Sequence, residues 1–100
     1  MRPGDLVKFV GVVRPLRGRG AWALQHHPGG VVDQAWLPSD APPGIYLGRP
    51  REPRGRAALD RRRVHVGSGI TQICDAEVLV NGQVYLVPAG NIERAREPVK

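Results

Sequence analysis

Apolar and polar positions along the chain fall into short runs that are typical of β-strands. Val, Ile, Leu and aromatic residues are concentrated in 5–13, 45–48, 76–80 and 83–87, and β-branched and aromatic side chains favour strands. Between the last two runs stands Asn81-Gly82, a dipeptide that favours a two-residue turn with positive φ at both positions. The pattern therefore predicts an all-β protein with a tight hairpin around this turn.

A second hairpin is predicted in the first half of the chain. The segments 21–25 and 31–37 flank 26–30, a spacer of histidine, proline and glycine that favours a turn. Trp22 and Trp36 lie at similar distances from that spacer, so they are expected to pair across the hairpin. The pair has two interpretations, filling of the core or an anchor in a protein interface, where Trp and Arg are enriched.

Three further segments complete the pattern. Residues 14–20 lack periodicity and carry two glycines, so they are interpreted as an exposed loop. Residues 64–66 can begin a strand before two glycines interrupt it. Residues 88–93 predict a single helical turn, with Asn91 placed to cap it.

Length and composition limit the chain to one modest domain. The chain has 100 residues, 41% of them hydrophobic, with 13 Gly and 10 Pro, which fits a single domain over 1–100 made of short strands and many turns. The lone Cys74 has no partner for an internal disulfide and is expected to be a small buried side chain. Neither a signal peptide nor a membrane span is visible, so we expect a soluble protein made in the cytoplasm.

The charge is strongly positive and is carried mainly by arginine. Fifteen Lys and Arg against nine Asp and Glu give a net charge of +6, which favours an anionic partner, although a solvated basic surface is the plain alternative. The densest stretch is 49–63, and a smaller group lies in 14–20. Aromatic stacking platforms are few, so contact with a phosphate backbone or with an acidic protein is easier to support than base recognition.

Metal binding and catalysis are not supported by the residue types and spacings. His26, His27, His65 and Cys74 show no zinc-ligand spacing. No Ser or Cys stands in a pattern that indicates an activated nucleophile. The sequence therefore predicts a protein that is not an enzyme and that holds no cofactor or metal.

Several segments resemble a Src-homology-3-like (SH3-like) small barrel. Such barrels often open with a strand like 3–7, carry a Gly-Ile-x-Leu strand like 44–47, and close with a tight hairpin like 76–87 followed by a short helical turn like the one at 87–92. The resemblance implies a small SH3-like barrel with two long inserted loops, at about 14–43 and 49–69, one of them a projecting hairpin. Long loops in compact domains are often functional.

The same opening strand and closing hairpin are similar to those of uncharacterised bacteriophage virion proteins. The resemblance implies a non-enzymatic virion structural protein, associated with capsid, neck or tail, that binds other virion proteins in multiple copies. The alternative is a basic nucleic-acid-binding module that contacts the phosphate backbone, and neither hypothesis involves a membrane. The predicted partner-binding residues are Arg17, Arg19, Trp22, Trp36, Arg49, Arg51, Arg54, Arg56, Arg61, Arg62 and Arg63.

Overall fold

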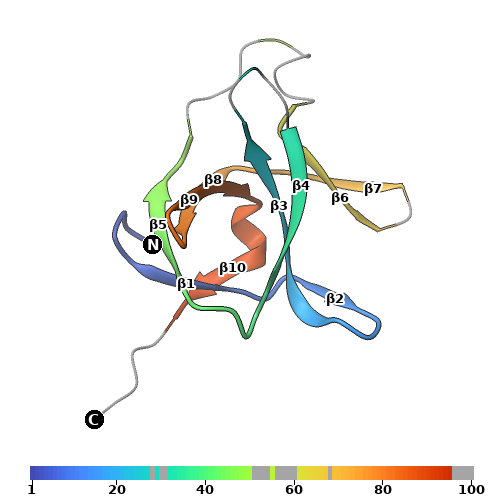
Figure 1. Cartoon of the computed structure of the whole chain (residues 1–100), viewed down its shortest axis with the longest axis horizontal. Coiled ribbons are helices and arrows are strands. Elements are labelled where there is room, and N and C mark those ends of the chain that lie inside the picture. The colour runs from blue at the N-terminus through green and yellow to red at the C-terminus, as the bar shows by residue number, and fades with distance from the viewer. Residues whose placement is uncertain (28, 30–31, 51–54, 56–60, 68, 96–100) are drawn as a thin grey trace.

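The computed structural model is all-β, as the hydrophobic pattern predicts (Figure 1). It describes residues 1–27, 29, 32–50, 55, 61–67 and 69–95. Within these residues ten short strands and one 3-10 helix follow one another along the chain. The elements are β1 (Leu6–Phe9), β2 (Val12–Arg14), β3 (Gly18–His26), β4 (Val32–Pro38), β5 (Gly44–Gly48), β6 (Arg63–Gly67), β7 (Ile70–Ile73), β8 (Ala76–Val80), β9 (Gln83–Val87), η1 (Ala89–Asn91) and β10 (Ile92–Arg94).

Most of the strands belong to one curved antiparallel sheet. Its strand order is β10-β1-β5-β8-β9-β3-β2, and β4 pairs with β3 outside this path. The hairpin β6–β7 forms a second, two-stranded sheet. Among the described residues β10 and β2 do not pair with each other, so the larger sheet curls without closing into a barrel.

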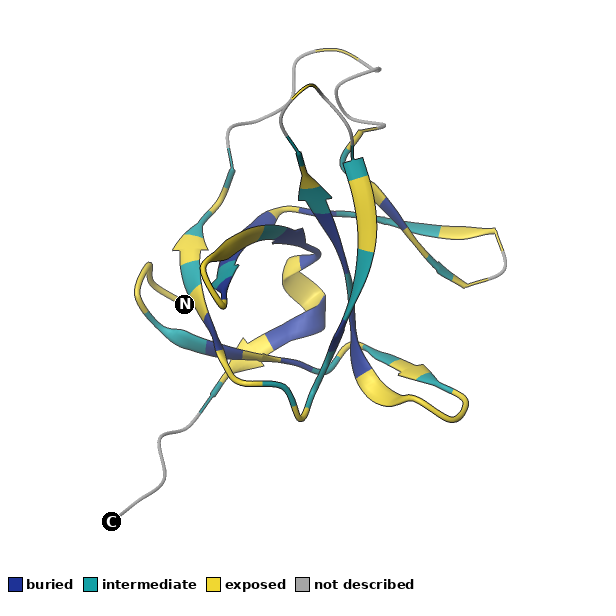
Figure 2. Ribbon diagram, viewed as in Figure 1, coloured by how far each residue is buried: buried dark blue, intermediate teal, exposed yellow. Residues whose placement is uncertain are grey.

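The concave side of the larger sheet holds the main hydrophobic core (Figure 2). Side chains alternate between the two faces of a strand, and in β1 and β8 every second residue is buried on this side. Half-buried Tyr46 and Tyr85 pack against the edge of this core. Its buried members are Val7, Phe9, Ala21, Ala23, Leu37, Ala76, Val78, Val80, Val87 and Ile92.

A second, smaller core lies on the convex side. Leu24 of β3 and Leu86 of β9 are covered there by Val64 of β6 and by Cys74, which follows β7. The side-chain amide of Gln34 in β4 donates to the backbone oxygen of His65 and accepts from its N–H, both at 3.0 Å. The β6–β7 hairpin is thus held over part of the convex face by burial and by hydrogen bonds.

The hairpin at Asn81-Gly82 is confirmed. Strands β8 and β9 pair over five residues, from Ala76 opposite Val87 to Val80 opposite Gln83. Asn81 and Gly82 have φ values of 50° and 78°, as a turn of this type requires.

The helical turn at 88–93 is confirmed as η1, but its predicted cap is wrong. Asn91 is the last residue of η1 rather than its cap; it is buried, and its side chain donates to Gln72 Oε1 at 2.6 Å. The backbone N–H of Ala89, at the start of η1, instead donates to the carboxylate of Asp75 at 2.6 Å. A residue distant in sequence therefore satisfies the backbone donor that a local cap was expected to satisfy.

Two expectations for the first half of the chain need correction. The strand predicted over 5–13 is broken at Gly11, where the Asn91 side chain lies so close that no Cβ has room. The loop predicted over 14–20 is largely strand, with a tight turn at 15–17 between β2 and β3.

The β3–β4 hairpin is confirmed, with seven residue pairs from Gly20 opposite Pro38 to His26 opposite Val32. It is not a separate projection. Ala21 and Ala23 of β3 lie in the main core, and Leu24 pairs with Leu86 of β9. Residues 57–62, where the sequence allows at most a turn or two of helix, lie mostly outside the described residues.

Candidate functional site

The β2–β3 hairpin, residues 12–20, projects from the curved sheet and is here called the arm (Figure 1). Its tip is a turn closed by a hydrogen bond from the Arg17 N–H to the Arg14 carbonyl oxygen, 3.2 Å long. Leu16 at the tip is fully exposed, and Val13 on β2 is 69% exposed. Exposed Arg17 and Arg19 stand beside them. The arm therefore presents an apolar tip flanked by cations.

The backbone of the tip is strained at Leu16. Its φ is +65°, in the left-handed region where the Cβ of an L residue crowds the following carbonyl oxygen, at a cost of roughly 1–2 kcal/mol. Glycine and asparagine reduce this cost, yet the position holds a large apolar residue in solvent. Leu16 therefore combines backbone strain with a fully exposed apolar side chain.

At the base of the arm, the side chains of one arginine and two tryptophans pack together. The rings of Trp22 and Trp36 meet edge to face, with centroids 5.2 Å apart, so the predicted cross-strand pairing is confirmed. The guanidinium carbon of Arg14 lies 4.5 Å from the Trp22 ring centroid and 5.1 Å from that of Trp36. Cation–π contact of this kind holds β2 against β3 and β4.

Gly20 makes room for this stack. It is buried, and a Cβ at that position would lie 2.7 Å from Cζ2 of Trp36. Trp22 also packs against the second core. Both tryptophans are half-buried, so they support the arm from within, and their predicted role in partner binding stays a prediction.

The predicted arginine residues are distributed over separate parts of the molecule. Arg17 and Arg19 belong to the arm, and exposed Arg49 directly follows β5. Arg61 and Arg62 precede β6 and Arg63 begins it; Arg61 and Arg63 already have interactions within the chain. Three more of the predicted residues lie outside the described part of the chain: Arg51, Arg54 and Arg56.

A row of aliphatic side chains crosses the convex face of four neighbouring strands and is here called the open face. Leu6 pairs with Ile45, Ile45 with Leu79, and Leu79 with Val84, and residues directly opposite each other lie on the same side of a sheet. Ile45 is 38% and Val84 45% exposed, and Leu6 and Leu79 are half-buried. The β6–β7 hairpin covers the sheet farther along, around Leu24 and Leu86, and leaves this row uncovered.

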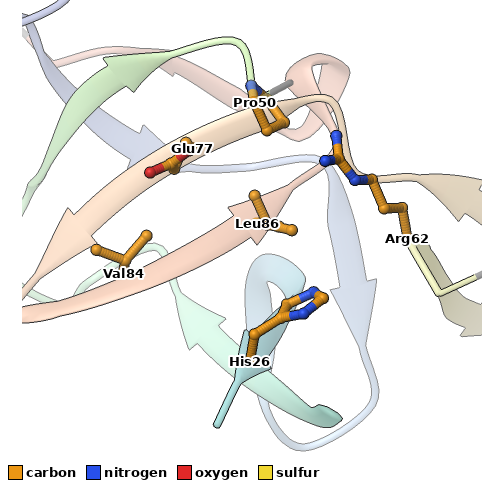
Figure 3. A pocket seen from close by; sticks show the side chains of 6 residues that line it. All are labelled: His26, Pro50, Arg62, Glu77, Val84 and Leu86. Atoms are coloured by element: carbon orange, nitrogen blue, oxygen red, sulfur yellow. The ribbon is translucent and has the colours of Figure 1, made fainter. Parts of the chain in front are cut away.

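A pocket of about 320 Å³ adjoins the open face, and Val84 and Leu86 of β9 form its apolar part (Figure 3). His26, Pro50, Arg62 and Glu77 also line it. Figure 3 shows Glu77 and Val84 on one side of Leu86 and Arg62 on the other.

The charge of the pocket differs between its two sides. Partial burial, together with the charges of Arg61 and Arg62, lowers the pKa of His26, which favours its neutral form. The pocket therefore has an apolar floor, a cationic side at Arg62 and a carboxylate at Glu77.

Comparison with protein-family models, with curated proteins and with solved structures found no match to this chain. No helix in the described part of the structure is long and apolar enough to cross a membrane. Within the same residues no three His, Cys, Asp or Glu side chains gather where they could hold a metal ion. His27 instead places its Nε2 2.8 Å from Asp33 Oδ2.

Sequence reasoning missed the two apolar surfaces. Leu16 was interpreted only as part of an arginine-rich loop, although an isolated leucine among Arg, Pro and Gly is a usable signal of an apolar tip. The open face was missed because the residues in β8 and β9 are apolar on both faces of the strand, and a run of that kind does not reveal which face is covered.

Proposed function

We propose that β1, β5, β8, β9 and β10 form an SH3-like frame with two insertions, β2–β4 and β6–β7. These five strands are neighbours in the larger sheet, in the order β10-β1-β5-β8-β9. They contain the segments that resemble SH3-like barrels, and η1 stands between β9 and β10, where the resemblance places a short helical turn. The insertions then supply the arm and the cover of the second core.

On this frame we propose a non-enzymatic structural protein of a virus particle that binds neighbouring subunits through the arm. The observation that carries the proposal is Leu16, a fully exposed aliphatic residue held at φ +65° on a projecting hairpin. In the described part of the chain the side chain of Leu16 buries no surface, which supports a contact outside the chain as the reason for its presence.

The surroundings of Leu16 fit a protein partner better than a nucleic acid. Protein interfaces are centred on apolar anchors that fill pockets, with arginine enriched around them. Leu16 with Val13 supplies the anchor, and Arg17 and Arg19 supply the cations. Nucleic-acid surfaces, in contrast, are dominated by contacts to phosphate, and the side chain of Leu16 makes no such contact.

Mass spectrometry of purified virus particles from cells that make the chain tests the proposal, and we expect the chain among the particle proteins. Particles assembled with the Leu16→Asp variant should contain far less of the chain. Ile70→Asp is the matched control, because Ile70 is 60% exposed and belongs to β7, which is not part of the arm. If particles lack the chain, or if both variants are incorporated equally, the proposal is wrong.

Binding of nucleic acid is the second candidate function. It is favoured by the positive potential at the start of β6, where Arg61 and Arg62 contribute to the lowered pKa of His26. This function would act through phosphate contacts and would not require the arm.

A further inference from the structure

We propose that copies of this chain associate head to tail, with the arm of one copy docked on the open face of the next. This inference rests on the proposed function, because it names a second copy of the chain as a partner of the arm. In this association the exposed apolar surface of the arm and that of the open face cover each other. Leu16 of one copy would lie against Val84 at the mouth of the pocket in the other.

The arm and the open face are different surfaces of the same molecule. The arm lies at the β2 end of the larger sheet, and the open face crosses β1, β5, β8 and β9 in its middle. Figure 1 shows the arm directed away from these strands, so it does not cover its own open face. Contact between two different surfaces leaves one of each free in every dimer, and further copies can add until a ring closes or a filament forms.

The two surfaces match in apolar character. The arm offers Leu16 and Val13, and the open face offers Ile45 and Val84 with half-buried Leu6 and Leu79. Burial of aliphatic surface on both partners contributes roughly 25 cal/mol per Å² removed from water. The apolar pair is therefore the expected centre of the contact.

The two surfaces also match in charge on the side where Leu16 would enter. The cations of Arg17 and Arg19 flank Leu16, and the carboxylate of Glu77 lies beside Val84 (Figure 3). Arg62 lines the pocket beyond Leu86, which directs the arm's cations toward Glu77. At the far end of the row, Lys8 is already neutralised by Glu93 at 3.0 Å.

The association is measured by sedimentation velocity on a dilution series of the pure full-length chain. We expect the wild type to form species larger than a dimer that dissociate on dilution. Leu16→Asp and Val84→Asp should each be monomeric alone, because each loses one of the two surfaces.

A mixture of the two variants provides the decisive observation. The intact arm of Val84→Asp can dock on the intact open face of Leu16→Asp, so the mixture should form a 1:1 dimer and nothing larger. The control Ile70→Asp should assemble like the wild type. One-dimensional NMR of each variant checks that it is folded, and Ile45→Asp replaces Val84→Asp if that variant is not.

Three results would overturn the inference: a wild type that stays monomeric at every concentration, variants that assemble normally alone, or a mixture of folded variants that stays monomeric. A monomeric wild type whose Leu16→Asp variant is still lost from particles would refute only the self-association. The proposed function would then stand, with a different protein receiving the arm.

Discussion

Leu16 concentrates strain and exposure in one residue. It combines φ +65° with a fully exposed side chain, and both features oppose the stability of the isolated chain. Asn81 also has positive φ, at 50°, but asparagine tolerates this conformation and serves the turn between β8 and β9. Asn81 is therefore explained by its turn, whereas the turn does not explain Leu16.

Leu16→Asn is therefore expected to raise the free energy of unfolding by roughly 0.5–1 kcal/mol, because asparagine adopts the left-handed region more readily. Urea denaturation followed by circular dichroism measures the change. Val13→Asn is the control, since it removes an exposed apolar residue where no positive φ is present, and it should give no gain. A loss of stability in Leu16→Asn would contradict the assignment of strain.

Cys74 shows how burial controls chemistry at a single residue. Burial, reinforced by the charge of Asp75, raises the pKa of its thiol to about 12 from 9.0. Only the thiolate reacts with alkylating agents, and a rise of this size reduces the thiolate fraction by about 1000-fold near neutral pH. Iodoacetamide labelling followed by mass spectrometry should therefore be at least about 1000-fold slower in the native protein than in urea.

The same shift predicts an effect of alkaline pH on stability. The folded state holds the Cys74 proton more tightly than the unfolded state, so this contribution is complete below pH 9.0 and is lost as the pH rises toward about 12. The loss of stability over this window should be smaller in Cys74→Ala, as measured by urea denaturation at several pH values. An equal loss in both proteins would contradict the raised pKa.

At the scale of elements, the β6–β7 hairpin depends on side chains from other strands. Among the described residues its two strands pair only with each other, and an isolated two-stranded hairpin is marginal in water. Gln34 continues the hydrogen bonding of β6 by pairing both polar groups of the His65 backbone. Burial of Val64 and Cys74 against Leu24 and Leu86 completes the attachment.

Gln34→Ala removes both of these hydrogen bonds and is expected to increase hydrogen exchange at the His65 amide by about 10-fold or more, since one net hydrogen bond is worth roughly 1 kcal/mol. Gln34→Glu keeps the acceptor for the His65 N–H but loses the donor to its carbonyl oxygen, so it should show a smaller increase. NMR exchange measurements compare the variants with Gln83→Ala, a change at the exposed first residue of β9. Unchanged exchange in Gln34→Ala would show that burial alone holds the hairpin.

At the scale of the whole molecule, one curved sheet separates a filled concave side from a convex side that is only partly covered. Glycine at position 44 permits this packing, because a Cβ there would meet Val78 and Val80 in the core. Each copy of the chain has a net charge of +6, so copies repel one another at long range. The apolar surfaces attract one another only at contact.

Salt concentration distinguishes the two candidate functions at this scale. Binding to a fluorescent DNA strand, measured by anisotropy, should fall steeply between about 50 and 200 mM salt, because phosphate contacts release counterions. Self-association through the arm should persist or strengthen over the same range, since salt screens the repulsion between like-charged copies. DNA binding that resists salt, together with self-association that salt abolishes, would contradict phosphate contacts as the basis of DNA binding and apolar contacts as the basis of self-association.

Local signals in the sequence determined several elements of the fold. Asn81-Gly82 specified its hairpin because the φ values of these two residues suit only a few turns. The runs of β-branched and aromatic residues predicted β5, β8 and β9, and the placement of Trp22 opposite Trp36 followed from their similar distances to one turn. These features depend on neighbouring residues, which a sequence displays directly.

Tertiary structure alone decided which faces are covered and which residues end an element. Gly11 breaks the first strand because Asn91 packs against it from η1, and Asp75 rather than Asn91 satisfies the start of that helix. The row formed by Leu6, Ile45, Leu79 and Val84 exists only through the pairing of four strands. Contacts between distant residues produce these features, because burial and exposure depend on what the folded chain brings to each surface.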